Sequence, residues 1–376
     1  MQILKSILIL SLTPFDCNRS RIIKEYLSLL KEFSPLLVAL NNGKQLEYET
    51  VQGVSVKRIR LNTKYLPKYF IFQILKFLEF GLKILKYYKN YNIIDCHCLI
   101  SLIIGSFYKK KYNAKLVFNA HELETERSGL SKIRKFIYKI IENKLIYKCD
   151  AVIVVSDSIK DWYMDKYKIK NVFCIYNSPN YIDFERSNYF REKYKLLESD
   201  KIFLYQGMFF PKRGIELLCK AFKKMLNTDN YLVFMGKGPL LDEIKKQALN
   251  NNHIFLHDAV PQNELYKYTS SASFGLSIIE NTSLSYEYCM PNKLFEYIMY
   301  QIPVIVSNGK DQAAFVNNNR VGYVLNNYSD DSLFELINTI DYSKYDELIK
   351  NIKKIKYYIS WNNQEKNYCD IYKKLA

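Results

Sequence analysis

The stretch KIFLYQGMFFPKRGIELLCKAFKKML, residues 201–226, contains two hydrophobic patterns in succession. Its first seven residues form a short, nearly continuous apolar run, which is typical of a strand buried on both faces of a parallel sheet. From residue 214 onward the apolar residues recur three and four apart, as they do on one face of a helix. A buried strand, a loop and a helix in this order predict one β-α unit of a parallel sheet.

The same alternation continues on both sides of this unit. The later runs YLVFMG, HIFLHDAV, SFGLSII and PVIVS predict further strands, with helical patterns between them, and so do the earlier runs SILILSL, PLLVAL, NIIDCHC, KLVFNA and AVIVVS. A chain of 376 residues exceeds what one core usually holds. We therefore expect an α/β protein with two Rossmann-like, doubly wound domains, whose ligands bind outside the carboxyl ends of the strands.

A polar, proline-containing stretch near residue 180 marks the expected boundary between these domains. Because the first apolar run has the length of a buried strand and no small-residue cleavage site follows it, we do not expect a signal peptide. We also expect no transmembrane helix, since no apolar stretch reaches about 18 residues. The predicted segments are a first domain over 1–178, a linker over 179–200, a second domain over 201–355, and a C-terminal helix over 356–376 that could cross back to the first domain.

The positive charge of the chain lies almost entirely in its first half. Residues 1–180 contain 30 Lys and Arg against 15 Asp and Glu, whereas residues 181–376 contribute only +2 to the total of +17. A basic half of this kind can bind an anionic membrane surface, a polyanionic glycan or nucleic acid, or can simply be well solvated. No nucleic-acid recognition module is present, so we do not expect a nucleic-acid partner.

The eight cysteines suggest neither a disulfide framework nor a zinc site, because no CxxC pair occurs among them. Cys96, His97 and Cys98 are adjacent, but they follow a strand-like run in which neighbouring side chains point to opposite faces. We therefore expect no metal there. Unpaired thiols fit a reducing cytoplasm.

Two glycine-containing loops follow predicted strands of the second half. After the strand that ends at Gly207, Arg213 precedes a helix, where free N–H groups and a guanidinium could bind an anion together. Gly236 and Gly238 form a G-x-G turn after the next strand, which is less than a full dinucleotide fingerprint. A surface-exposed basic pair at residues 212–213 remains the alternative interpretation.

The segment PNKLFEYIMYQIPVIVS, residues 291–307, places a cation and a carboxylate at the start of another helix. Pro291 can begin a helix, which leaves the first amides near Asn292, Lys293 and Leu294. Lys293 beside such amides could bind a diphosphate, and Glu296, one turn later, could accept hydrogen bonds from two sugar hydroxyls. The alternative is a solvated helix face with an ion pair three residues apart.

In the first half, FNAHELETE, residues 118–126, places His121 just beyond a strand end. A histidine at that position would face a ligand cleft. The simpler interpretation is a histidine that hydrogen-bonds to the backbone at the end of its strand.

Together and in this order, the segments resemble the retaining glycosyltransferases of the GT-B fold, in family 4. The resemblance rests on GMFFPKRGIELLCKAF, YLVFMGKGPL, IFLHDAVPQNELYKYTSSASFGLSII and PNKLFEYIMYQIPVIVS, and in the first half on FNAHELETE, CDAVIVVSDSIKDWY and NVFCIYNSPN. It covers most of the chain. It implies that the two domains face each other across a cleft, with the acceptor bound mainly by the first.

The resemblance also implies roles for the residues above. Arg213 and Lys293 would neutralise the departing diphosphate, Glu296 would hold the ribose, and His121 would lie beside the transferred sugar. The donor would be a nucleoside-diphosphate sugar of the UDP or GDP type, and the acceptor a glycan or a lipid-linked molecule. No metal or cofactor is implied. Surface-glycan synthesis, such as that of lipopolysaccharide or capsule, is the implied process.

The sequence departs from the family pattern in three places. The family often carries two glutamates eight residues apart, and the earlier position here is Tyr288, so Glu287 and Glu280 both remain candidates for the donor sugar. Met208 stands where an arginine is usual. TPFDCNRSRIIKEY, residues 13–26, contains no glycine where the family has a Gly-rich loop, although its Arg19 and Arg21 open the next helix on the acceptor side.

The aromatic and lysine-rich stretch LPKYFIFQILKFLEFGLKILKYYKNY, residues 66–91, has helical spacing. It could lie on the anionic inner face of the cytoplasmic membrane, which would bring a cytoplasmic enzyme to a lipid-linked acceptor. The alternative is an ordinary domain helix that packs on the sheet. Two rival functions also remain: a GT-B sugar-nucleotide epimerase, and a non-catalytic basic protein that binds glycans.

Overall fold

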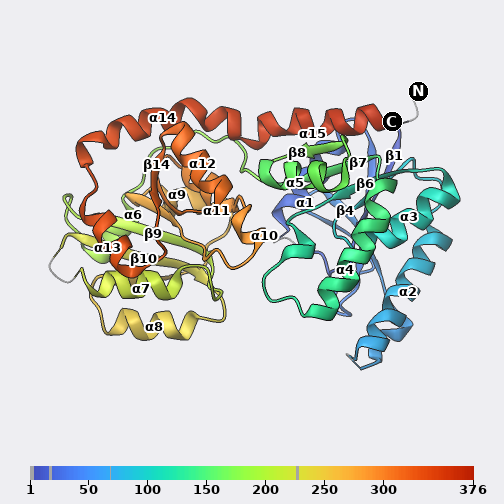
Figure 1. Ribbon diagram of the computed structural model, residues 1–376, viewed down its shortest axis with the longest axis horizontal. Helices are drawn as coiled ribbons and strands as arrows, with labels where there is room; N and C mark the ends of the chain where they lie inside the picture. The colour runs from blue at the N-terminus through green and yellow to red at the C-terminus, as the bar shows by residue number, and fades with distance from the viewer. Residues whose placement is uncertain (1–3, 17–18, 68, 226–227) are drawn as a thin grey trace. The chain divides into compact units, whose positions relative to one another are not determined.

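The computed structural model describes residues 4–16, 19–67, 69–225 and 228–376. The chain forms two compact units (Figure 1). The first comprises Met1–Ile175 together with Glu365–Ala376, and the second comprises Tyr176–Gln364. Each unit is a β-sheet covered by helices, as the alternation of apolar strands and amphipathic helices predicts.

The first unit contains an eight-stranded sheet in the order β3-β4-β2-β1-β5-β6-β7-β8. All neighbouring strands are parallel except β3 and β4, which form an antiparallel pair at one edge. The strands are β1 (Ser6–Ser11), β2 (Ser34–Leu40), β3 (Tyr48–Val51), β4 (Val54–Ile59), β5 (Ile93–Cys96), β6 (Lys115–Asn119), β7 (Ala151–Val154) and β8 (Val172–Cys174).

Helices connect the parallel strands of this sheet. They are α1 (Ser20–Leu29), α2 (Phe70–Tyr87), α3 (Ser101–Tyr112), α4 (Lys132–Leu145) and α5 (Asp157–Tyr167), with short 3₁₀ helices η1 (Asn62–Tyr65), η2 (Glu124–Glu126) and η3 (Ile146–Lys148). The chain returns to this unit at its end, because α15 (Trp361–Leu375) contributes its residues from Glu365 onward.

The second unit contains a fully parallel six-stranded sheet in the order β11-β10-β9-β12-β13-β14. The strand order reverses between β9 and β12, so the loops that follow these two strands turn to opposite faces and leave a crevice at their carboxyl ends. The strands are β9 (Lys201–Met208), β10 (Asn230–Lys237), β11 (Ile254–Asp258), β12 (Phe274–Ser277), β13 (Val304–Ser307) and β14 (Gly322–Leu325).

Two separate hydrophobic clusters cover the two faces of the second sheet. Phe203 and Tyr205 of β9 belong to a cluster with residues of α7, α8 and α13, whereas Ile202 and Leu204 belong to a cluster with residues of α6, α11 and α14. Figure 1 shows α7 and α8 on one side of this sheet and α14 on the other. The middle of the strand, residues 202–205, is therefore apolar on both faces. The helices are α6 (Tyr189–Tyr194), α7 (Ile215–Lys223), α8 (Leu241–Leu249), α9 (Leu265–Thr269), α10 (Leu284–Glu287), α11 (Asn292–Met299), α12 (Lys310–Asn319), α13 (Asp330–Asn338) and α14 (Tyr345–Ile359), with η4 (Tyr342–Lys344).

The predicted pair of doubly wound α/β domains is thus confirmed. Residues 179–200, which the sequence marks as a linker, include α6, whose Phe190 is fully buried in the second unit. The end of the chain forms two helices, α14 and α15, that meet at Ser360. Within the described residues, no helix is long and apolar enough to cross a membrane.

Candidate functional site

A cavity of about 180 Å³ lies at the carboxyl ends of β9 and β10. Gly207, Gly236, Val260 and Glu296 are among the residues that line it. Gly236 has a φ of 155°, and a Cβ atom there would lie 1.9 Å from the carbonyl oxygen of Gly207. Only glycine therefore allows the two strand ends to approach this closely. A side chain at Gly207 would meet no described atom within 4 Å.

Glu296 borders the cavity and is held by amide groups. Its Oε2 accepts a hydrogen bond from Gln206 Nε2 at 2.6 Å, and its Oε1 accepts one from Gln262 Nε2 at 3.1 Å. Gln206 is buried, and its own carbonyl oxygen accepts a hydrogen bond from Thr269 Oγ1 at 2.7 Å. These hydrogen bonds from neutral amide groups fix the Glu296 carboxylate at the cavity wall.

Lys293 carries a cation that no described residue neutralises by a hydrogen bond. Part of the side chain is accessible, but its Nζ atom is buried and lies 3.3 Å from the ring centre of Tyr205. Burial lowers the pKa of Lys293 well below its usual range, nearby Arg213 lowers it further, and Glu296 opposes the shift. A desolvated ammonium group without an anionic partner is costly to the fold, which suggests a site prepared for an anion.

Arg213 provides a second cation at the same end of the sheet. Its guanidinium lies 4.7 Å from the ring centre of Tyr286, and no described carboxylate forms an ion pair with it. Gly214 follows with a φ of 81°, where a Cβ atom would lie 2.7 Å from Ile278. The helix α7 can therefore begin this close to the end of β12 only with glycine at position 214. The structure thus brings Arg213 and Lys293 together.

The other predicted residues of this unit surround the same region. The amide of Leu294 donates a hydrogen bond to the carbonyl of Pro291 at 3.0 Å, so it is not a free amide as expected. Asn292 is instead held through its side chain, whose Oδ1 accepts from Asn177 Nδ2 at 2.8 Å. Gly238 lies in the turn after β10, where a Cβ atom would lie 2.6 Å from the backbone of Phe209.

The two candidate glutamates lie on the segment that follows β12. The amide of Glu280 donates a hydrogen bond to the carbonyl of Lys212 at 3.0 Å, which ties this segment to the loop that carries Arg213. Glu287 is the last residue of α10. Neither carboxylate has a hydrogen bond or an ion pair with a residue that the structure describes. Both remain candidates for the donor sugar.

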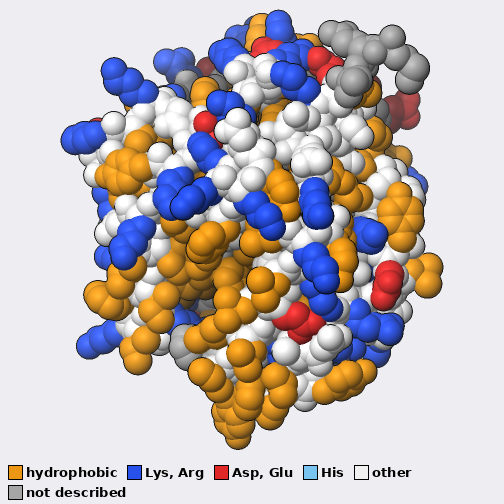
Figure 2. Space-filling model, turned by 90° about the vertical axis from the view of Figure 1, so that its right-hand side faces the viewer, with side chains coloured by type: hydrophobic (Ala, Val, Ile, Leu, Met, Phe, Trp, Pro, Cys, Tyr) orange, Lys and Arg blue, Asp and Glu red, His pale blue; other side chains and the backbone are white. Residues whose placement is uncertain are grey.

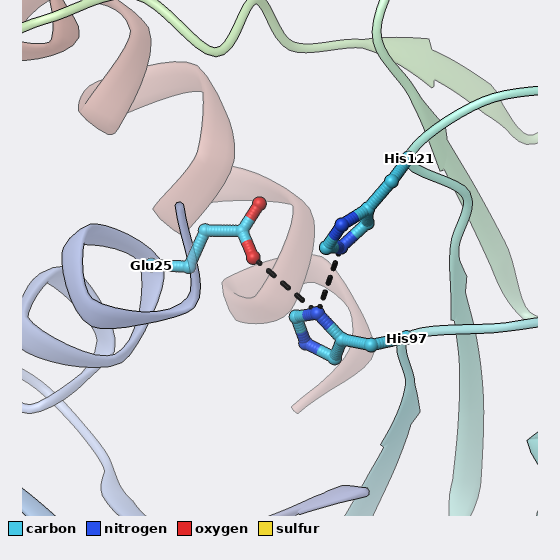
Figure 3. Close-up of side chains that lie close together, drawn as sticks. All are labelled: Glu25, His97 and His121. Carbon is cyan, nitrogen blue, oxygen red and sulfur yellow. Dashed lines mark hydrogen bonds and ion pairs between the residues drawn. The ribbon is translucent and has the colours of Figure 1, made fainter. Parts of the chain in front are cut away.

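In the first unit, His121 lies at the carboxyl end of β6 beside the buried His97 and Glu25, and it is itself partly accessible (Figure 3). Its Nε2 lies 3.0 Å from Nδ1 of His97, and Nε2 of His97 lies 3.1 Å from Oδ2 of Asp95. Burial lowers the pKa of His121 well below its usual range, and Arg21, His97 when it is protonated, and Arg19 lower it further. These surroundings favour the neutral form of the His121 ring.

Glu25 completes this cluster, and its ligand atom lies within 4.8 Å of those of His97 and His121. Such a set could in principle hold a metal ion. Both oxygens of Glu25 are already used, however, because Oε1 accepts from Arg21 at 2.7 Å and Oε2 accepts from Asn119 at 3.0 Å. With the guanidinium cation beside it, the cluster is better described as a hydrogen-bonded network than as a metal centre.

The two arginines expected on the acceptor side lie in different environments. Arg21 is buried, and it donates hydrogen bonds to Glu25 and, at 2.8 Å, to Asn119. This placement gives Arg21 a structural task rather than contact with an acceptor. Arg19 precedes α1, is exposed, and donates a hydrogen bond to Oγ1 of Thr13 at 3.1 Å.

Sequence reasoning missed the residues that support the site. Tyr205, Gln206 and Tyr286 hold the cations and the carboxylate, and Asp95 and His97 hold His121. Gln206 stands directly before Gly207 at a strand end, and this position is the one feature of the sequence that indicates a place near the site. The contacts of the others join residues far apart in the sequence and leave no local pattern.

Two protein-family models match the chain. Residues 187–355 match the family described as "Glycosyl transferases group 1", and residues 29–180 match the family described as "Glycosyltransferase Family 4". The two matches together cover most of both units. An uncharacterized glycosyltransferase of Methanocaldococcus jannaschii is 29% identical over 211 residues, which are 53% of this chain and 53% of the relative. The match thus spans about half the length of that curated relative.

Solved structures of glycosyltransferases have the same fold. Sucrose-phosphate synthase from Thermosynechococcus elongatus superposes with a TM-score of 0.79 at 17% identity, over 99% of each chain. HepE from Anabaena, solved in complex with UDP, superposes with a TM-score of 0.73 at 12% identity, over 98% of this chain and 100% of that one. At these identities the likeness establishes the fold, which is GT-B.

Proposed function

We propose that the chain transfers a sugar from a nucleoside-diphosphate sugar to a hydroxyl group, because two glycosyltransferase family models match its two halves. The nucleotide is of the UDP or GDP type, the acceptor is a glycan or a lipid-linked molecule, and the anomeric configuration is retained. The proposed transfer is a step in the synthesis of a surface glycan such as lipopolysaccharide or capsule.

One observation carries this proposal: Arg213 and Lys293, which form no ion pair with a described carboxylate, lie near each other and near Glu296, which lines a cavity at the strand ends. Arg213 and Lys293 offer donors for a diphosphate, and Glu296 offers acceptors for the two hydroxyls of a ribose. The exposed Gln262 can leave Glu296 when a ribose arrives. Gly207 and Gly236 line the cavity at the strand ends. We assign Gly238, in the turn after β10, and Asn292, at the start of α11, to the same donor site.

The proposed reaction is an attack by an acceptor hydroxyl on the anomeric carbon, with the nucleoside diphosphate as the leaving group. The bond from the anomeric carbon to the diphosphate oxygen breaks, and the bond to the acceptor oxygen forms. Negative charge grows on the departing diphosphate, so fixed cations aimed at it stabilise the transition state. Arg213 and Lys293 supply this charge without a metal ion. His121 is assigned to the sugar, together with Glu280 or Glu287, and Arg19 to the acceptor.

Helix α2 supports a proposal that the first unit binds an anionic membrane. Phe80 and Ile84 of this helix are buried in the first unit, and beside them Glu79 accepts hydrogen bonds from the amides of Asn62 and Thr63 while Lys83 donates to the carbonyl of Arg60. The opposite stripe is apolar and exposed: Ile71, Leu75, Leu78 and Leu82 are 60%, 42%, 51% and 67% accessible. An ordinary surface helix exposes polar residues on the side away from the core, so this second, exposed apolar stripe suits a helix that lies at a membrane surface.

Lysines near the exposed apolar stripe of α2 would meet lipid headgroups. On the side of the molecule drawn in Figure 2, apolar side chains gather at the lower end, with Lys and Arg side chains next to them and few acidic ones. An open groove of about 610 Å³ between α3 and α4 combines apolar residues such as Phe107 and Ile140 with Lys110 and Lys144. A lipid-linked acceptor would be presented at such a surface.

We predict that a Leu78→Glu, Leu82→Glu double variant binds phosphatidylglycerol vesicles at least about tenfold more weakly than the natural protein. The reason is that two apolar contacts with the lipid are lost. Flotation measures the effect. Leu249→Glu is the matched control, because Leu249 of α8 is 84% exposed and lies in the other unit. Equal flotation of all three proteins, or indifference to lipid charge, contradicts the membrane proposal.

Thermal unfolding with a panel of nucleotides tests the proposed donor. UDP or GDP should raise the unfolding midpoint, because a ligand at a hundred times its Kd stabilises a fold by about 2.7 kcal/mol. The corresponding monophosphates should do so much less, since they lack the second phosphate for Arg213 and Lys293. Donors that stabilise the protein are then tested for release of nucleoside diphosphate. Equal shifts with monophosphates and diphosphates would count against the diphosphate site.

A further inference from the structure

A continuous chain of hydrogen bonds runs through the core of the first unit and ends at His121. Tyr368 and Tyr372, both on α15 and fully buried, have hydroxyl oxygens 3.1 Å apart. The hydroxyl of Tyr372 lies 2.8 Å from Oδ2 of Asp95, which also lies 3.1 Å from Nε2 of His97. Nδ1 of His97 lies 3.0 Å from Nε2 of His121 (Figure 3).

The chemistry of these groups determines where the protons lie. An ionised carboxylate only accepts hydrogen bonds, so Asp95 requires a proton on Nε2 of His97. In neutral His97 the other nitrogen, Nδ1, is then an acceptor. His121 must donate to it from Nε2, and the remaining nitrogen of neutral His121, Nδ1, carries a lone pair.

We propose that Asp95 and His97 are positioning residues that fix His121 in the tautomer with its proton on Nε2. In this tautomer Nδ1 of His121 can accept a hydrogen bond from a hydroxyl of the transferred sugar. The inference rests on the role proposed above for His121. It adds the residues that determine whether His121 offers a donor or an acceptor to the sugar.

Protonation of His97 reverses this arrangement. With protons on both its nitrogens, His97 donates to Nε2 of His121, which must then keep its own proton on Nδ1. Four charged or titratable groups face His97: Asp95, Glu25, Arg21 and His121. Burial lowers the pKa of His97, but Asp95 and Glu25 outweigh it, so the pKa lies above its ordinary value. Sugar transfer should therefore decline as the pH falls through the pKa of His97.

Nitrogen-15 NMR of the histidine rings tests the proposal directly, because the chain has only four histidines. At pH 8.5 we expect both His97 and His121 to carry the proton on Nε2. In Asp95→Asn, the amide nitrogen can take the place of Oδ2 and donate one hydrogen to Nε2 of His97 and the other to the hydroxyl oxygen of Tyr372, which then donates to Tyr368. Both histidines should then move their protons to Nδ1. Tyr372→Phe is the matched control, since it keeps the carboxylate and should keep the tautomers.

Activity provides the second readout. We expect Asp95→Asn to lower kcat by about tenfold to a hundredfold, the range typical of groups that orient a functional histidine. Tyr372→Phe should lower kcat much less. If Asp95→Asn leaves the His121 tautomer unchanged, the inference is wrong even where sugar transfer stands. If the natural protein releases no nucleoside diphosphate from any donor, the proposed function fails, whereas the tautomers can still be as inferred.

A variant that does not fold leaves the test intact. Titration of the natural protein should show the His121 ring signals changing between the two tautomers at the pH at which His97 takes up its proton. Independent titration of the two rings would overturn the inference.

Discussion

Replacing Lys293 with methionine should lower kcat for sugar transfer by about a hundredfold or more. The departing diphosphate would lose one preorganised cation, and the loss of one such donor typically costs about 2.7–4 kcal/mol. Methionine keeps an unbranched chain against the ring of Tyr205, over which the ammonium nitrogen lies. Release of nucleoside diphosphate, measured with a donor selected by thermal shift, provides the rate. A kcat within a few-fold of that of the natural protein would remove Lys293 from the proposed mechanism.

The same substitution should raise the unfolding midpoint at neutral pH. The pKa of Lys293 is lower in the folded protein than in the unfolded chain. At pH values between these two pKa values, the unfolded chain therefore binds more protons than the folded protein. The buried ammonium therefore costs stability at all pH values below its lowered pKa, and that cost fades as the pH rises through the interval. Methionine removes it. A protein that is more stable and less active identifies a functional charge rather than a structural one.

Nucleotide binding should reverse the shift in the pKa of Lys293. A bound diphosphate favours the charged ammonium, so UDP or GDP binding should take up a proton, and affinity should fall as the pH rises. Calorimetry in two buffers of different ionisation enthalpy measures this uptake. In the Lys293→Met variant the uptake should disappear. Lys245→Met is the control, because Lys245 is an exposed cation on α8 of the same unit.

Replacing Arg213 with alanine should lower kcat to a similar extent, by about a hundredfold. Its guanidinium lies 4.7 Å from the ring centre of Tyr286 and forms no ion pair with a described carboxylate, so its N–H groups can bind phosphate oxygens. Arg213→Lys should restore only part of the rate, because an ammonium group cannot bind two oxygens in one plane. Lys245→Ala should keep the full rate. If Arg213→Ala has the activity of this control, the diphosphate site has been assigned to the wrong residues.

The fold could be predicted from the sequence because the apolar residues of each strand indicate that the strand is buried. Residues 201–207 are apolar at nearly every position, and in the structure both faces of β9 pack against helices. The places of Arg213, Lys293 and Glu296 in the chain could also be predicted, since each residue stands near a strand end or a helix start. Their positions relative to the backbone follow from local pattern alone.

The contacts of the site could not be predicted in this way. Lys293 was expected to meet free helix amides, but the ring of Tyr205, 88 residues earlier, shields it from water. Arg21 resembles a surface arginine in the sequence, yet Asn119 and Glu25 bury it. Burial of charge depends on partners that only the folded chain brings together. Sequence patterns show where a side chain starts, and not what surrounds its end.

The return of the chain to the first unit also has a consequence for biosynthesis. Tyr368 and Tyr372 of α15 fill the core beside Asp95, although the whole second unit separates them from it in the sequence. The ribosome must therefore translate residues 176–364 before the first unit can close. Until then the nascent chain exposes an apolar face that awaits its last helix, which makes it a natural client for chaperones.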